Sequence, residues 1–257
     1  MNDLNDSRRP NFKLYTFRAL AAATALAAGC STTSTVPETA YAPPSPAKAT
    51  AYPDPGMAVR VGGDMNAAVT GTDGDFRFGP CRVDTPLPVG YPRPTPPGAI
   101  EVKTYPAARL AEVTGSGDPD SGMNGAFWPL FNHIKSKDIA MTSPVEMNYT
   151  GMDGEAAKQP TSWSMAFLYR SPDMNKTGPD GKVTVRDVAP ITVLSIGLKG
   201  DYSMELVERG REALRDFLAA NPRWRIAGDW RALYYNGPAI LFWNKWAEIQ
   251  VPVRAVE

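Results

Sequence analysis

The sequence predicts an α+β fold in its C-terminal part, and three observations lead to this prediction. Stretches of alternating apolar residues predict strands, and two stretches with apolar residues at helical spacing predict amphipathic helices. The order strand, helix, strand, strand then occurs twice, in two units of similar length. This repetition indicates an internal duplication with pseudo-two-fold symmetry. An antiparallel sheet system that carries both helices is the expected result.

The first unit begins at Ile100, where apolar and polar residues start to alternate. Phe127, Leu130, Phe131 and Ile134 then recur at helical spacing, after a loop rich in Gly, Asp and Ser. The expected elements are strands at 100–103 and 107–113, a helix at 123–136, and strands at 145–149 and 163–169.

The second unit opens with a strand that is apolar on both faces and is therefore expected at the centre of the sheet. Ser203 is a suitable N-cap for the second helix, which should end before Asn221 and Pro222. The expected strands of this unit are 191–198, 224–235 and 247–253.

Residues 1–29 have the order of a lipoprotein signal peptide. Basic residues precede a short apolar stretch that ends at Gly29-Cys30. The apolar stretch is far below the roughly 20 residues needed to span a bilayer. The Leu26-to-Cys30 segment resembles a bacterial lipobox, although Ala27 stands where leucine is more usual. We therefore expect lipidation at Cys30, export, and a lipid-anchored protein of the cell envelope, on the periplasmic face or at the outer membrane.

Residues 30–98 comprise the lipidated cysteine, a tether and an irregular segment. Residues 31–58 are rich in Ser, Thr, Pro and Ala, a composition that cannot bury enough apolar surface to offset chain entropy. Residues 59–83 read as loops with a short strand, and a Pro-rich run leads into the domain. Cys81 is expected to be a free thiol in a loop. Whether 59–98 packs on the domain is left open.

Composition excludes several classes of function. Lys plus Arg and Asp plus Glu both number 27, so the basic excess of a nucleic-acid-binding domain is missing. With two cysteines and one histidine, a structural zinc site is not expected. The chain has no nucleophile elbow, phosphate loop or Ser/His/Asp arrangement. A noncatalytic protein is therefore favoured, without excluding an enzyme.

Several motifs resemble the SOUL heme-binding family. They are Ile100–Pro106, Ala126–Lys135, Asp138–Met147, Trp230–Asn236 and Trp246–Pro252. The most specific part is Met141-Thr142-Ser143-Pro144-Val145, and the resemblance covers roughly residues 99–254. It implies a SOUL-like heme-binding domain, built as a distorted β-barrel from two βαββ repeats with two flanking helices. It also implies that heme or another tetrapyrrole binds in an apolar groove beside the first helix.

The residues expected to contact such a ligand lie on or near the first helix: Asn124, Phe127, Phe131, His133 and Met141. Phe127 and Phe131 fit a core-facing stripe as well as a ligand surface. His133 is the only histidine, so it is the possible axial ligand. A helix-edge histidine bonded to a loop carbonyl is the favoured alternative.

Two other functions remain open. A GyrI-like protein with a similar duplicated architecture uses a carboxylate in a central cleft, as a small-molecule hydrolase or sensor. Glu146 would be the candidate base there, although strand alternation favours an outward-pointing Glu146. The second is a structural envelope lipoprotein without a small ligand. A deep pocket containing Glu146 would favour the GyrI-like function over a groove beside residues 123–135.

Overall fold

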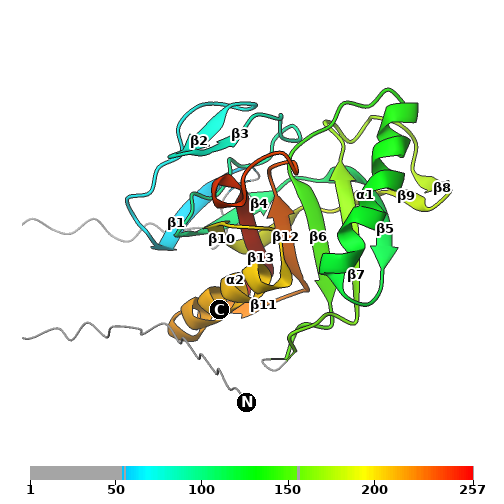
Figure 1. Cartoon of the computed structure of the whole chain (residues 1–257). Helices are drawn as coiled ribbons and strands as arrows, with labels where there is room; N and C mark the ends of the chain where they lie inside the picture. The colour runs from blue at the N-terminus through cyan, green and yellow to red at the C-terminus, as the bar shows by residue number, and fades with distance from the viewer. Residues whose placement is uncertain (1–53, 55, 155–156, 257) are drawn as a thin grey trace, which may run out of the picture. The chain divides into compact units, whose positions relative to one another are not determined.

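The computed structural model describes residue 54 and residues 56–154 and 157–256. They form a mostly antiparallel sheet with two long helices on one face (Figure 1). The α+β prediction is confirmed. The predicted signal peptide, the lipidated Cys30 and most of the tether lie outside the described residues.

The large sheet follows the order β1-β4-β10-β13-β12-β6-β7-β5-β9-β8. Its first half consists of β1 (Ala58–Gly63), β4 (Ala99–Tyr105), β10 (Ile191–Lys199), β13 (Trp246–Ala255) and β12 (Trp230–Tyr234). The second half consists of β6 (Val145–Thr150), β7 (Ser162–Leu168), β5 (Ala108–Gly115), β9 (Val183–Val188) and β8 (Gly178–Asp180). β11 (Trp224–Ile226) pairs with β13, and β2 (Phe76–Phe78) and β3 (Cys81–Val83) form a separate hairpin. The path of hydrogen-bonded strands is open, so the expected barrel is not confirmed.

The sheet bends where one strand continues along the chain almost directly into the next, at β4 to β5 and at β9 to β10. The chain passes from β4 to β5 through Pro106 and from β9 to β10 through Pro190. Proline has no N–H to donate, so the ladder is interrupted between the pairs Tyr105↔Ile191 and Ala108↔Val188. One helix packs on each side of the bend: α1 on β5, β7 and β9, and α2 on β10 and β13. This arrangement agrees with the predicted duplication.

Helix α1 (Pro119–Ser136) begins four residues before the predicted start. Asp118 is the N-cap, because its side chain accepts hydrogen bonds from the backbone N–H groups of Asp120 and Ser121. Pro119 occupies the first turn, where its missing N–H has no cost. The predicted start was wrong because this cap lies in a stretch whose Gly, Asp and Ser content indicated a loop.

Helix α2 (Met204–Ala220) begins and ends as predicted. The Ser203 hydroxyl accepts a hydrogen bond from the N–H of Leu206, and the helix ends before Asn221. None of the helices in the described part of the chain is both long enough and apolar enough to cross a membrane.

Residues 59–98 pack on the domain. β1 extends the sheet at its edge beside β4, and the segment after β1 lies on the sheet face opposite the helices. The β2–β3 hairpin and Leu87 form a buried cluster with Tyr235 and Trp246. Residues 84–97, which we call the strap, continue across this face. The Thr95 carbonyl accepts a hydrogen bond of 2.7 Å from the Trp246 indole. Cys81 is buried in β3, so its predicted place in a loop was wrong.

The β8–β9 hairpin has no counterpart among the predicted elements. Val183 and Val185 are buried on either side of exposed Thr184, and β9 pairs with β5. This short alternation was the available signal. The hairpin matters for the site because it carries Asp180 to the end of α1.

Candidate functional site

Three aromatic rings of α1 form a patch that reaches from the core to solvent. Phe127 and Phe131 are half-buried and stacked, with ring centroids 5.8 Å apart, and Phe127 also packs against Phe167 in the core. Trp128 is 60% exposed and stands edge-on to both phenylalanines. We call Phe127, Trp128 and Phe131 the aromatic patch. Trp128 was not among the predicted contact residues, although it lies between two residues of the apolar stripe.

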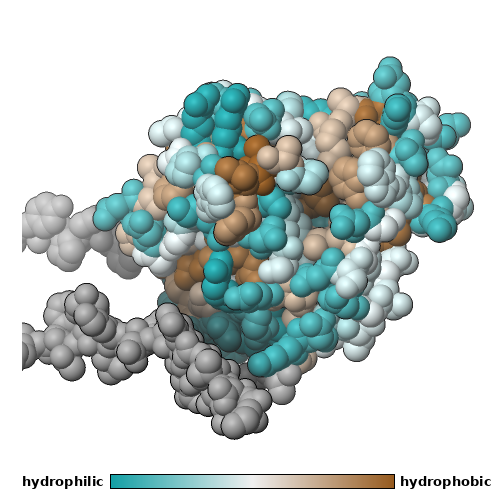
Figure 2. Space-filling model, in the orientation of Figure 1, coloured by the Kyte–Doolittle hydropathy of each residue, from teal (hydrophilic) through white to brown (hydrophobic). Residues whose placement is uncertain are grey.

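The other expected contact residues flank this patch. Asn124 is exposed and lies one turn before Trp128 on α1. Met141 is half-buried and packs against the same core cluster as Phe127 and Phe131. Exposed apolar side chains also gather before and within the short helix η1 (Phe242–Asn244), at residues 240–243. Figure 2 shows apolar atoms over η1 and along α1 on this face.

His133 is buried on α1, and both of its ring nitrogens have partners. Nδ1 lies 2.9 Å from Asp180 Oδ2, and Nε2 lies 2.7 Å from the Tyr169 hydroxyl. The expected partner, a loop carbonyl, is replaced by a carboxylate and a phenol. Lys137 and His133 hold the pKa of Asp180 below its usual range. Axial ligation of a heme iron by His133 would require one of these hydrogen bonds to break.

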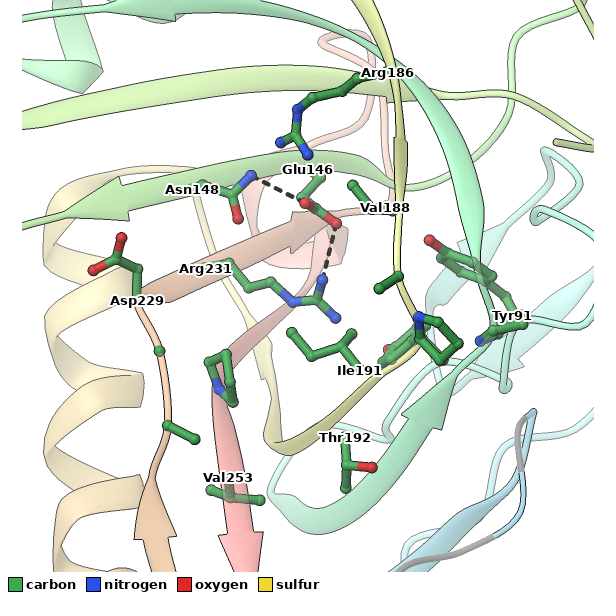
Figure 3. A pocket seen from close by; sticks show the side chains of 17 residues that line it. Tyr91, Glu146, Asn148, Arg186, Val188, Ile191, Thr192, Asp229, Arg231 and Val253 are labelled. Atoms are coloured by element: carbon green, nitrogen blue, oxygen red, sulfur yellow. Dashed lines mark hydrogen bonds and ion pairs between the residues drawn. The ribbon is translucent and has the colours of Figure 1, made fainter.

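A cleft with a volume of about 490 Å³ lies at the bend, on the face opposite the helices (Figure 3). It is the size of a typical small-molecule site. Its lining residues are Tyr91, Tyr105, Pro106, Glu146, Asn148, Arg186, Val188, Ala189, Pro190, Ile191, Thr192, Ala227, Gly228, Asp229, Arg231, Pro252 and Val253.

Glu146 points away from the core, as strand alternation favours, but it is buried and lines this cleft instead of facing open solvent. The Glu146 carboxylate accepts hydrogen bonds from Arg231 Nη1 at 3.2 Å and from Asn148 Nδ2 at 3.0 Å. Strand alternation does place Glu146 opposite the core-facing Met147. The sheet face on which Glu146 lies is covered, however, because the strap packs on it.

Arg231, on the neighbouring strand β12, is the central cation of the cleft. Its Nε donates to Gln250 Oε1 at 2.9 Å, and its guanidinium lies 4.9 Å from the centroid of the Tyr105 ring. Burial opposes the charge of Arg231, but nearby Glu146 offsets this and raises the pKa of Arg231. Arg231 Nη2 is buried and has no hydrogen-bond partner among the described residues.

A fully buried polar network lies beside the cleft and holds the strap. Lys103 Nζ lies 2.9 and 3.0 Å from the two oxygens of Glu248. Glu248 also accepts from the Thr95 N–H at 2.8 Å and from the Tyr235 hydroxyl at 2.6 Å. Burial acts to raise the pKa of Glu248, but Lys103 and the hydrogen bonds from Ser195 and Tyr235 together outweigh it, and the pKa falls to about 2. Because Lys103 and Glu248 have no exposed surface, this network is structural.

Comparisons with known proteins agree with this architecture. The family model described as SOUL heme-binding protein matches residues 93–252. The crystal structure of the EcmrR C-terminal domain superposes with a TM-score of 0.51 at 16% identity, covering 61% of this chain and 98% of that one. In the cryo-EM structure of an EcmrR–DNA complex the TM-score is 0.51 at 15% identity, and this chain spans 57% of that chain. An uncharacterized conserved protein from Listeria innocua gives 0.49 at 16% identity, covering 63% and 94%. These likenesses concern the fold alone. No curated protein matches the sequence.

Proposed function

Because this chain belongs to the SOUL heme-binding protein family, we propose that it is a noncatalytic binding protein for heme or a related tetrapyrrole. We place the ligand against the aromatic patch of α1. The observation that carries this placement is the exposure of Trp128, whose ring stands free of the core at 60% exposure. The exposed Trp128 ring offers a flat apolar surface, which is what a porphyrin face requires.

The second candidate function is a GyrI-like small-molecule sensor or hydrolase, which the cleft that contains Glu146 favours. The contacts of Glu146 support a sensor over a hydrolase. A general base needs an oxygen free to accept a proton from a water or a substrate. Glu146 is only 6% exposed, and each of its oxygens already accepts one hydrogen bond, from Arg231 or from Asn148. We therefore do not assign Glu146 the role of catalytic base.

Hemin titration tests the tetrapyrrole proposal. Addition of the protein to hemin is expected to give a saturable shift of the Soret band of hemin. Trp128→Ala should weaken hemin binding on the order of tenfold to a hundredfold, because a large apolar contact is lost. Asn132→Ala, at an exposed position on the same helix, is the matched control and should leave affinity unchanged. Absence of any Soret shift would contradict the proposal and favour a structural lipoprotein without a small ligand.

The axial role of His133 is tested separately from binding. If His133 ligates the iron, His133→Ala changes the position of the Soret band. If the band is unchanged while binding persists, the porphyrin lies on α1 without this ligand, as the two hydrogen bonds of His133 favour.

We also propose that the protein is exported and anchored to an envelope membrane through lipid on Cys30. The order of basic residues, apolar stretch and Gly29-Cys30 supports this. Labelled palmitate should be incorporated by the full chain expressed in a bacterium and not by Cys30→Ala. Equal labelling of both would refute anchoring at Cys30. A nucleic-acid partner is not part of the proposal, since the charge of the chain is balanced.

A further inference from the structure

We propose that the cleft at the bend is a second ligand site, for an uncharged apolar molecule whose carbonyl oxygen accepts hydrogen bonds from Arg231 and Tyr91. This cleft lies on the sheet face opposite the helices, away from the aromatic patch. The inference is independent of tetrapyrrole binding.

The first observation is the unused donor of Arg231. Arg231 is 7% exposed, and its Nε and Nη1 are hydrogen-bonded to Gln250 and Glu146. Its Nη2 is buried without a partner among the described residues, although Arg231 lines the cleft. A buried donor without a partner is costly, and native proteins rarely leave one unless something else satisfies it. An acceptor atom of a bound molecule would do so.

The second observation is Tyr91, which the strap brings to the same cleft. Its hydroxyl forms no hydrogen bond with the residues that the structure describes, and it is turned toward the cleft (Figure 3). Its ring is held edge-on against Tyr105, with centroids 4.8 Å apart. Burial raises the pKa of Tyr91, and nearby Glu146 raises it further, so the hydroxyl keeps its proton and can donate it. Arg231 and Tyr91 thus offer two hydrogen-bond donors to a molecule in the cleft.

The charges around the cleft favour an uncharged acceptor over an anion. Each arginine of the cleft already forms an ion pair with a carboxylate. Arg231 pairs with Glu146, and Arg186 donates two hydrogen bonds of 2.7 and 2.8 Å to the oxygens of Glu112. Asp229 adds a negative charge at the rim, where it is exposed. A ligand anion would therefore enter a site without excess positive charge and would have to shed its hydration. A ketone, ester, amide or lactone oxygen accepts the same hydrogen bonds at lower cost.

The remaining walls of the cleft are apolar. Val188, Pro190, Ile191, Pro106 and Val253 contribute carbon surface around the two donors. This combination of apolar walls and a few convergent polar groups is typical of sites for small organic molecules. The ligand class that fits is an apolar body of modest size with one carbonyl group.

The probe we choose is Prodan, an uncharged naphthalene that carries a propionyl ketone and whose emission moves to shorter wavelength when it leaves water. Prodan should bind saturably to the full-length protein. The comparison probe is 2-(dimethylamino)naphthalene, which has the same ring system without the ketone. It should bind at least tenfold more weakly, because hydrogen bonds to a charged donor are among the stronger ones.

Variants then assign the binding to the cleft. Tyr91→Phe keeps the ring and removes the hydroxyl, and should weaken Prodan about threefold to tenfold. Arg231→Met removes the charged guanidinium and should weaken Prodan about tenfold or more. Neither should change affinity for the ketone-free probe. Ala189→Trp fills the cleft from an exposed rim position and should abolish binding of both probes. Arg225→Met, an exposed arginine outside the cleft, is the matched control.

Three outcomes would overturn the inference. The first is absence of saturable Prodan binding, and the second is equal affinity for the two probes. The third is binding that survives Ala189→Trp but is lost in Trp128→Ala, which would place the probe on α1. Arg231→Met can fail to fold, because Arg231 also holds Gln250 and Glu146. Tyr91→Phe then decides alone, and unchanged Prodan affinity in a folded Tyr91→Phe protein also counts against the inference.

Discussion

Lys103→Met is expected to lower the free energy of unfolding by about 3–5 kcal/mol, the usual cost of removing one partner of a buried ion pair. Lys103 and Glu248 have no exposed surface, and the two oxygens of Glu248 both lie within 3.0 Å of Lys103 Nζ. Without Lys103 the Glu248 charge would remain buried among neutral donors. Urea denaturation followed by circular dichroism measures the change.

The double variant Lys103→Met/Glu248→Gln separates the charge from the hydrogen bonds. Glutamine is uncharged and can still accept from the Thr95 N–H and the Tyr235 hydroxyl, which Glu248 now holds. The double variant should therefore be more stable than Lys103→Met alone. A cost below about 1 kcal/mol for Lys103→Met, or no recovery in the double variant, would show that this pair does not hold the strap side of the sheet.

The elements of this fold were predictable where local chemistry determines them. Ser203 caps α2 as its sequence indicates, and the apolar stripe of α1 faces the core as its spacing indicates. The bend of the sheet and the order of its strands depend on pairings between distant residues. β4 pairs with β10, for example, and no local pattern contains that information.

The cleft was less predictable than the helix surface for a similar reason. Glu146, Arg231 and Glu248 each sit in an alternating strand, a pattern that equally fits a solvent-facing charge. They are buried because the strap covers the second face of the sheet. A Pro-rich segment has no periodicity from which such a covering role can be deduced. The family resemblance likewise identified the α1 surface and gave no indication of Tyr91.

Leu130→Ala is expected to cost about 2–5 kcal/mol, in contrast to Trp128→Ala two positions earlier on α1. Leu130 has no exposed surface and belongs to the main core cluster beneath the helix. Removing its side chain leaves a cavity that the surrounding strands can fill only in part. Trp128 is 60% exposed, so its removal should cost roughly 1 kcal/mol or less. Urea titration of both variants gives the comparison.

The value of this pair lies in its opposite expected effects on stability and on hemin. Leu130→Ala removes no atom of the aromatic patch, so the protein that remains folded should bind hemin with nearly unchanged affinity. Trp128→Ala should retain stability and lose affinity. If both variants lose affinity in proportion to their loss of stability, hemin reports only on the integrity of α1. The aromatic patch would then have no separate part in binding. Opposite effects would instead assign Leu130 to the fold and Trp128 to the ligand surface.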